Sequence, residues 1–159
     1  MRDFSVHRRA FVALVVSFAA APTRATTRPA MTLHRSPSCG CCVGWARRLQ
    51  QAGYSVSVIN EVDMAPVKQR ARVPESLQSC HTAFISNYVI EGHVPPEAID
   101  RLLLERPAIK GLAVPDMPGG TPGMETPGIN PEPFTVMAFK DGEGPSVFLD
   151  YPAGYRTPS

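Results

Sequence analysis

Residues 32–53 read TLHRSPSCGCCVGWARRLQQAG, and this segment predicts a strand, a turn and a helix in succession. Residues 32–34 favour a short strand, which Ser36-Pro37-Ser38 ends. Ser38 is a good helix N-cap, and Gly53 is a good stop. Between them, apolar residues recur at the spacing of an amphipathic helix, predicted over residues 42–52: Cys42, Trp45, Ala46 and Leu49.

The chain that follows continues the alternation of strands and helices. The predicted elements are, in order, a half-buried strand at 54–58, a short helix at 63–72, two strands at 82–85 and 88–90 joined by Ser86-Asn87, a helix opened by Pro95-Pro96-Glu97, and a hairpin of 134–139 and 147–149. Residues 107–133 hold seven Pro and five Gly in 27 residues, so we predict a long loop there. Loops of this length inside a compact domain are usually functional or disordered.

This order of elements predicts an α/β fold. A parallel strand–helix–strand start, followed by an antiparallel pair and a helix, is typical of the thioredoxin-like plan (βαβαββα), here with an appended C-terminal β-hairpin. We expect one such domain over residues 32–151, with a linker at 26–31 and a tail at 152–159.

Residues 1–25 have the features of an export signal. Arg8-Arg9 precedes twelve apolar or small residues (10–21), which are too few to span a bilayer, and Thr23-Arg24-Ala25 favours cleavage. The Arg-Arg-x-Phe order resembles a twin-arginine signal, although His7 stands where Ser or Thr is usual, so twin-arginine and Sec export both stay open. An uncleaved membrane anchor is the alternative. We expect a periplasmic protein that leaves the membrane once the signal is cleaved.

Composition excludes several classes of protein. The 159 residues suffice for one ordinary domain, and 43% hydrophobic with 19% charged residues is a globular composition. Four cysteines are too few for a disulfide scaffold. The net charge of +2 comes from arginines within residues 1–25, so the predicted domain is almost neutral and we expect no nucleic-acid partner.

The cysteines cluster where a helix is expected to begin. Cys39 and Cys42 form a Cys-x-x-Cys pair on one helical face, where free N–H groups and the helix dipole stabilise thiolates. Cys41 points elsewhere on a regular helix unless Gly40 lets the first turn bend. Cys80 directly precedes a predicted strand that, in a thioredoxin-like fold, begins beside this helix end. We therefore expect the four sulfurs to converge.

Three interpretations of this cluster stay open. Several thiolates can bind a soft metal centre such as Cu(I), zinc or an iron–sulfur cluster. A thioredoxin-type redox pair needs only Cys39 and Cys42. The third interpretation is that the cysteines form passive disulfides or inert buried thiols. Zinc sites usually space their ligands as two separated Cys-x-x-Cys pairs. Adjacent Cys41 and Cys42 can instead bridge different ions of a cluster, which favours copper.

Histidines and methionines offer further candidates. His34 ends the strand that leads to Cys39 and His81 adjoins Cys80, so each could be a secondary ligand or a proton carrier, whereas we expect His93 to fix a turn. Met117 and Met124 lie in the Pro/Gly-rich loop, where a thioether could bind Cu(I) or fill a gap in the core.

Four motifs make the chain similar to a known family: LHRSPSCGCCVGW (33–45), SCHTA (79–83), IEGHVP (90–95) and GLAVP (111–115). They resemble the CopG-type bacterial copper-resistance proteins, long catalogued as a domain of unknown function. The resemblance implies a periplasmic thioredoxin-like fold with a cysteine-bridged multinuclear copper cluster. It also implies a role in copper tolerance through the oxidation state of copper. The ligands it implies are Cys39, Cys41, Cys42 and Cys80.

We therefore expect a periplasmic copper-binding protein that holds several Cu(I) ions. Copper-handling proteins or an electron donor of the periplasm are its expected partners. A copper oxidoreductase activity is open, as is a chaperone role. The rival prediction is a thiol–disulfide oxidoreductase that uses Cys39 as nucleophile and Cys42 as resolving thiol.

Overall fold

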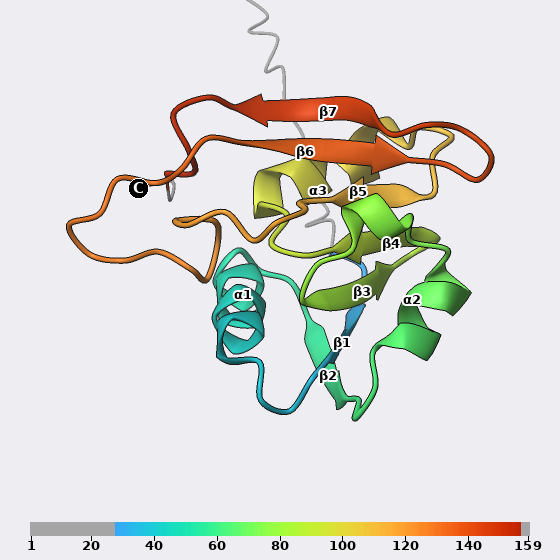
Figure 1. Ribbon diagram of the computed structural model, residues 1–159, viewed down its shortest axis with the longest axis horizontal. Coiled ribbons are helices and arrows are strands. Elements are labelled where there is room, and N and C mark those ends of the chain that lie inside the picture. Colours follow the sequence, from blue (N-terminus) through green and yellow to red (C-terminus); the bar gives the residue numbers. More distant parts are fainter. Residues whose placement is uncertain (1–27, 157–159) are drawn as a thin grey trace, which may run out of the picture.

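The computed structural model describes residues 28–156, which form one sheet with helices on both of its faces (Figure 1). The elements are β1 (Met31–Arg35), α1 (Gly40–Gln51), β2 (Val56–Asn60), α2 (Ala65–Ala71), the 3-10 turn η1 (Glu75–Leu77), β3 (His81–Ile85), β4 (Tyr88–Glu91), α3 (Pro96–Glu105), β5 (Gly111–Ala113), β6 (Phe134–Phe139) and β7 (Ser146–Tyr151).

The sheet has the order β2-β1-β3-β4-β5-β6-β7. β1 and β2 run parallel, and β3 is antiparallel to both β1 and β4. β5 lies parallel to β4, and β6 and β7 continue the sheet antiparallel. The predicted α/β class and the succession of elements from β1 to α3 are confirmed. The thioredoxin-like assignment itself stays a prediction.

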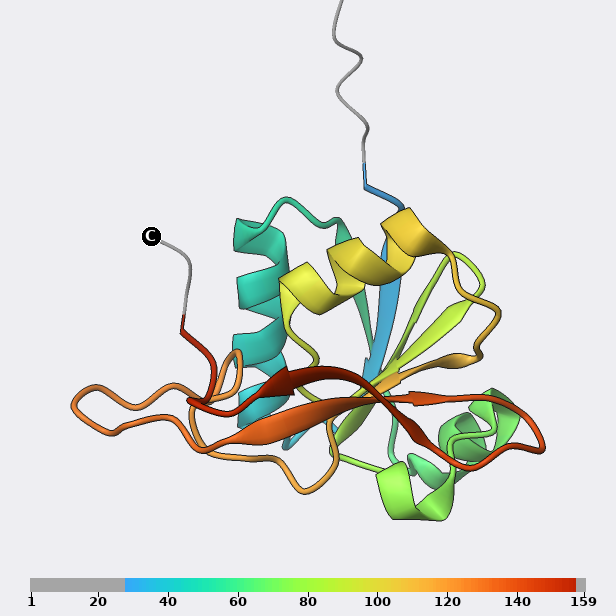
Figure 2. The same cartoon turned by 90° about the horizontal axis from the view of Figure 1, so that it is seen from above.

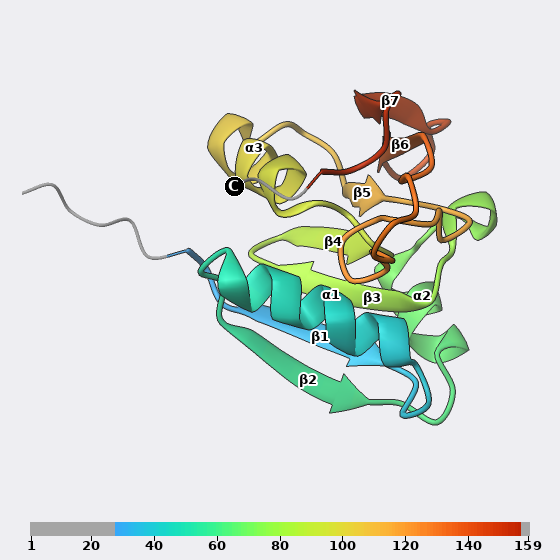
Figure 3. The ribbon, with the colours of Figure 1, turned by 90° about the vertical axis from the view of Figure 1, so that its left-hand side faces the viewer.

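Each face of the sheet has its own core. α1 and α3 lie side by side on one face (Figure 2), where Trp45, Leu49 and Ile99 pack against β1 and β4. α2 and η1 cover the other face, with Leu77 and Phe139 in a smaller cluster. Seen from the side, α1 runs along β1 and β3, and α2 lies behind them (Figure 3). Alternate residues of the strands serve the two clusters, as the pleat requires.

The prediction of one long loop over residues 107–133 is wrong in one part, because β5 occupies Gly111–Ala113. A Cβ on Gly111 would lie 2.1 Å from the Val89 carbonyl oxygen, so glycine is required for β5 to reach β4. Leu112 is fully buried. Tertiary packing thus forms a strand where the density of Pro and Gly predicted none.

Three further details differ from the prediction. β2 alternates in sequence but is largely exposed, because it is an edge strand. β1 begins at Met31, which is buried, so this residue belongs to the domain and not to a linker. Tyr155, predicted in the tail, is 5% exposed and joins the main core.

Within residues 28–156, no helix has the length and apolar character that crossing a membrane would take. The predicted signal lies outside the described residues, as do residues 26 and 27 of the predicted linker.

Candidate metal centre

Cys39 is the N-cap of α1, so the expectation that Ser38 caps this helix is wrong. The Cys39 Sγ accepts a hydrogen bond of 3.3 Å from the Cys42 N–H. The Ser38 hydroxyl is bonded instead to Ser36 Oγ at 2.9 Å. The turn before the helix is held by Arg35, whose Nη1 donates to the carbonyls of Ser36, Pro37 and Cys39. These hydrogen bonds fix the backbone that leads into the cysteine segment.

Gly40 does not bend the helix. It is a regular member of α1, and a Cβ there would meet nothing within 4 Å. Cys41 reaches the other sulfurs from the first turn of a regular helix, since the helix begins before Cys41 and not at Cys42 as predicted.

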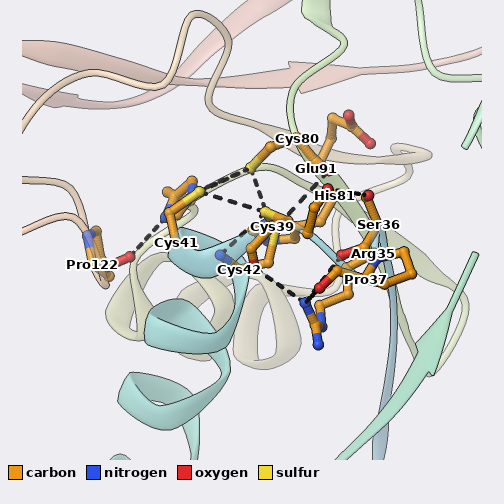
Figure 4. The surroundings of a disulfide bond; sticks show 12 residues. Arg35, Ser36, Pro37, Cys39, Cys41, Cys42, Cys80, His81, Glu91 and Pro122 are labelled. Carbon is orange, nitrogen blue, oxygen red and sulfur yellow. Dashed lines mark hydrogen bonds between the residues drawn. A yellow bond between two sulfur atoms is a disulfide. The ribbon is translucent and has the colours of Figure 1, made fainter.

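The structure brings the four predicted cysteines together (Figure 4). Their Sγ atoms all lie within 4.8 Å of one another. Cys39 and Cys42 form a disulfide, while Cys41 and Cys80 are free thiols. The Cys41 Sγ lies 3.5 Å from that of Cys39 and 4.0 Å from that of Cys80. Cys42 is fully buried beneath this group, and the other three are partly exposed.

Two histidines flank Cys80. His81 Nδ1 and His93 Nε2 each lie 3.2 Å from the Cys80 Sγ, and both rings are fully buried. His93 Nδ1 is 2.8 Å from the Pro122 carbonyl oxygen, which can only accept a hydrogen bond. The proton therefore sits on Nδ1, and in the neutral ring Nε2 turns a lone pair toward the sulfur. Cys80, His81 and His93 form a second group of closely spaced donor atoms.

The prediction for His81 placed it correctly beside the cysteines, but His93 was missed. A signal for it was present in the sequence. A two-residue turn at Ser86-Asn87 pairs Thr82 with Glu91, and the same register extended beyond the strands sets Cys80 opposite His93.

The structure does not bring His34 to the cysteines. Its Nδ1 is bonded to Glu61 at 2.7 Å, and its ring packs edge-on against Phe84. Among the described residues it belongs to neither group of closely spaced donor atoms. This geometry therefore gives no support to the prediction that His34 is a ligand or proton carrier there, because its side chain is engaged by Glu61.

Met117 and Met124 both lie in the segment that follows β5. Met117 is 43% exposed and, with Asp116, has a positive φ. Met124 belongs to a tight turn in which its N–H donates to the Thr121 carbonyl. That either thioether binds copper stays a prediction.

Burial governs the protonation of the site. It raises the pKa of the Cys80 thiol to about 12, with a smaller contribution from neighbouring Cys41. Burial also lowers the pKa of His81 well below its usual value, helped by His93 and Lys68, and lowers that of His93. Both imidazoles are therefore neutral at pH 7, and Cys80 is a protonated thiol.

A buried ion pair fixes the segment that carries Cys80. Glu91 is fully buried, and its carboxylate accepts from Lys68 Nζ, from the Ser79 N–H at 2.6 Å and from the Thr82 hydroxyl at 2.7 Å. Burial raises the pKa of Glu91, whereas these three donors oppose that effect. Because two of the donors, Ser79 and Thr82, lie on either side of Cys80, the carboxylate fixes the position of Cys80 just before β3.

A loop from the Pro/Gly-rich segment docks on α1 next to the cysteines. Gly123 and Gly44 approach so closely that a Cβ on Gly44 would lie 2.5 Å from the Gly123 oxygen. Glu125 bonds both Arg48, at 2.7 Å, and the Gly123 N–H, at 2.8 Å. The same loop supplies the Pro122 carbonyl to His93, so it helps to build the site.

Fold and site together define a class: an α/β domain with a cysteine cluster at a helix N-terminus, able to hold a soft metal or to exchange disulfides. Two solved structures, described as "Copper resistance protein copG- Form 1" and "Copper resistance protein copG- Form 2", are each 41% identical to this chain. They cover 79% of it and 98% and 99% of their own chains, with TM-scores of 0.73 and 0.72. The chain belongs to the CopG family of copper resistance proteins.

A family model described as "Protein of unknown function, DUF411" matches residues 77–124, which include Cys80, His93 and the docked loop. A search of curated proteins finds no match. The resemblance inferred from the sequence motifs is thereby confirmed.

Proposed function

We propose that the protein binds copper as Cu(I) in the periplasm, through Cys39, Cys41, Cys42 and Cys80. The observation that carries this proposal is the convergence of four Sγ atoms within 4.8 Å of one another, from two segments far apart in the chain. The family's structures are named as copper resistance proteins, which supports copper as the metal.

The donor set fits Cu(I). Thiolate is a soft ligand that favours Cu(I), and neighbouring Cys41 and Cys42 can bridge different ions. All four sulfurs become available only after the Cys39–Cys42 disulfide takes up two electrons and two protons. We infer that the reduced site holds several Cu(I) ions in a thiolate-bridged cluster.

A redox activity toward copper is part of the proposal. When the Cys39 and Cys42 thiols join, one S–S bond forms, two protons go to water and two electrons are released. Two Cu(II) ions, each taking one electron, become two Cu(I) ions and balance the reaction. Reduction of the disulfide for a further turnover needs a dithiol electron donor of the same compartment.

Elemental analysis tests the copper proposal. The reduced chain, reconstituted anaerobically with Cu(I), is expected to retain several copper ions, and the Cys80→Ser variant is expected to lose most of them. His34→Gln is the matched control, since His34 is bonded to Glu61 and should not affect the copper content. A Cys80→Ser protein with a full copper complement would refute the four-cysteine site.

A second candidate function is a metal-independent thiol–disulfide oxidoreductase. The disulfide between Cys39 and Cys42 at the start of α1 favours it. This function predicts turnover of a disulfide substrate without copper and no effect of Cys80→Ser. Retained copper together with failure to reduce a small disulfide would exclude it.

A further inference from the structure

Formation of the Cys39–Cys42 disulfide leaves two thiols that face each other. The sequence has four cysteines, all within the described residues, so Cys41 and Cys80 are the two that remain free. Their Sγ atoms point toward each other (Figure 4) at a distance of 4.0 Å. Both side chains are partly exposed.

No other cysteine offers Cys41 or Cys80 a free thiol as a disulfide partner. The Cys41 Sγ is 3.5 Å from that of Cys39, but Cys39 is already bonded. The fully buried Cys42 Sγ is likewise already bonded to Cys39, and it lies 3.9 Å from the Cys80 carbonyl oxygen. A disulfide needs its sulfurs at about 2 Å, and side-chain rotation can close the remaining gap where the backbones already bring the thiols into contact.

We propose that Cys41 and Cys80 form a second disulfide, which makes the site a store of four electrons in two dithiol pairs. The inference deepens the copper proposal and rests on it only where copper is the oxidant; formation of the disulfide itself does not depend on copper.

The chemistry of the second pair balances as that of the first does. The S–H bonds of Cys41 and Cys80 break, one S–S bond forms, two protons go to water and two electrons reduce two Cu(II) ions to Cu(I). The fully reduced chain can therefore reduce four Cu(II) ions, and the chain with the Cys39–Cys42 disulfide can reduce two.

A second disulfide also removes the last two free thiols from the site. With all four sulfurs oxidised, the two groups of closely spaced donor atoms found among the described residues retain the imidazoles of His81 and His93, and a pair of imidazoles holds Cu(I) less well than a thiolate cluster. Oxidation of this pair is thus expected to release copper.

Thiol counting tests the inference without copper. The full chain is reduced, freed of metal and treated with excess diamide, which accepts two electrons and two protons per disulfide. Remaining thiols are then alkylated and counted by intact mass. We expect no free thiol in the monomer. Two alkylated thiols, mapped to Cys41 and Cys80, would overturn the proposal, as would pairing of these cysteines only between chains.

Peptide mapping identifies the bond. Trypsin releases residues 36–47, which contain Cys39, Cys41 and Cys42, and residues 73–101, which contain Cys80, so a variant is needed to show which cysteine is joined to Cys80. The oxidised wild type should give these two peptides joined, and Cys41→Ser should give them separate, with one alkylated thiol on Cys80. Joined peptides in Cys41→Ser would assign the bond to another cysteine and contradict the proposal.

Copper analysis of the same samples separates the two proposals. If the second disulfide forms but the reduced chain holds no Cu(I), the copper function fails and the inference stands. If the reduced chain holds copper but Cys41 and Cys80 can still be alkylated after diamide, the copper function stands and the second disulfide is refuted.

Discussion

At the scale of the residue, the carboxylate of Glu91 fixes the segment that carries Cys80. It is fully buried and is bonded to Lys68, to the Ser79 N–H and to the Thr82 hydroxyl. A buried ion pair contributes little net stability, but the removal of one partner leaves an uncompensated charge in the interior. Its value here is the position that it imposes on Cys80.

Glu91→Leu is therefore expected to lower the free energy of unfolding by about 3–5 kcal/mol, because Lys68 and two further donors lose their acceptor. Urea denaturation of the reduced, metal-free chain measures this. The double variant Lys68→Met/Glu91→Leu is the control and should recover part of the loss, since it leaves no buried charge. A Glu91→Leu protein within about 1 kcal/mol of wild type would contradict the argument.

At the scale of elements, the contact between Gly44 of α1 and Gly123 of the docked loop joins parts of the chain far apart in sequence. Gly123 has a φ of +86°, and a Cβ on it would lie 2.2 Å from the Trp45 nitrogen. The contact sets Pro122 over His93. Gly44 and Gly123 thereby allow a loop with little regular structure to pack against α1.

Gly44→Ala is expected to destabilise the fold by about 1–3 kcal/mol, because the new methyl group collides with the Gly123 carbonyl and forces the loop outward. Thermal unfolding and the rate of proteolysis between Gly119 and Glu125 measure the effect. Gly40→Ala, in the same helix with no atom near its Cβ, is the matched control and should not be destabilised. Equal stability of both variants would show that the loop adapts freely.

Much of the fold could be predicted because its signals are local. The spacing of Cys42, Trp45, Ala46 and Leu49 indicates α1 without reference to any other element, and all four are buried. β5 could not be predicted, because Gly111–Ala113 becomes a strand only between β4 and β6. A segment that owes its structure to its neighbours leaves little pattern of its own.

The candidate site divides in the same way. The clustering of three cysteines at a helix start is local, and the place of Cys80 follows from the strand order. His93 depends on the hairpin register carried past the last paired residue, and His34 on its partner Glu61, which lies 27 residues away. Residue type and proximity in sequence therefore placed His81 beside the cysteines but could not tell His34 from His93.

Over the whole molecule, an ion pair ties the segment before β1 to α3. Arg28 forms a two-point ion pair with Asp100 of α3, at 2.8 and 2.9 Å, and its guanidinium lies 5.0 Å from the Tyr54 ring centre. The Tyr54 hydroxyl donates to the same carboxylate at 2.7 Å. These donors, Arg28 first, hold the pKa of Asp100 below its usual value.

Because the pKa of Asp100 is lower in the folded than in the unfolded chain, the unfolded chain takes up the proton first as the pH falls. The stabilisation by Asp100 is thus present above about pH 4 and is lost as the pH falls through the folded value. Since the side chain is 42% exposed, we expect at most about 1 kcal/mol. Asp100→Asn should flatten the decline in unfolding free energy as the pH falls below about 4, and an unchanged slope would refute this.

The distance along the chain between Cys80 and the other three cysteines has a thermodynamic consequence. Unfolding separates these two segments, so a ligand that requires all four sulfurs has affinity only for the folded state. Mass action then adds its binding to the stability of the domain, by about 2.7 kcal/mol at a hundredfold excess over the dissociation constant. The melting temperature of the chain therefore reports how much of the site is occupied. It rises with the concentration of a ligand that binds Cys80 together with the other cysteines. It rises less with a ligand that residues 39–42 alone can bind in the unfolded chain.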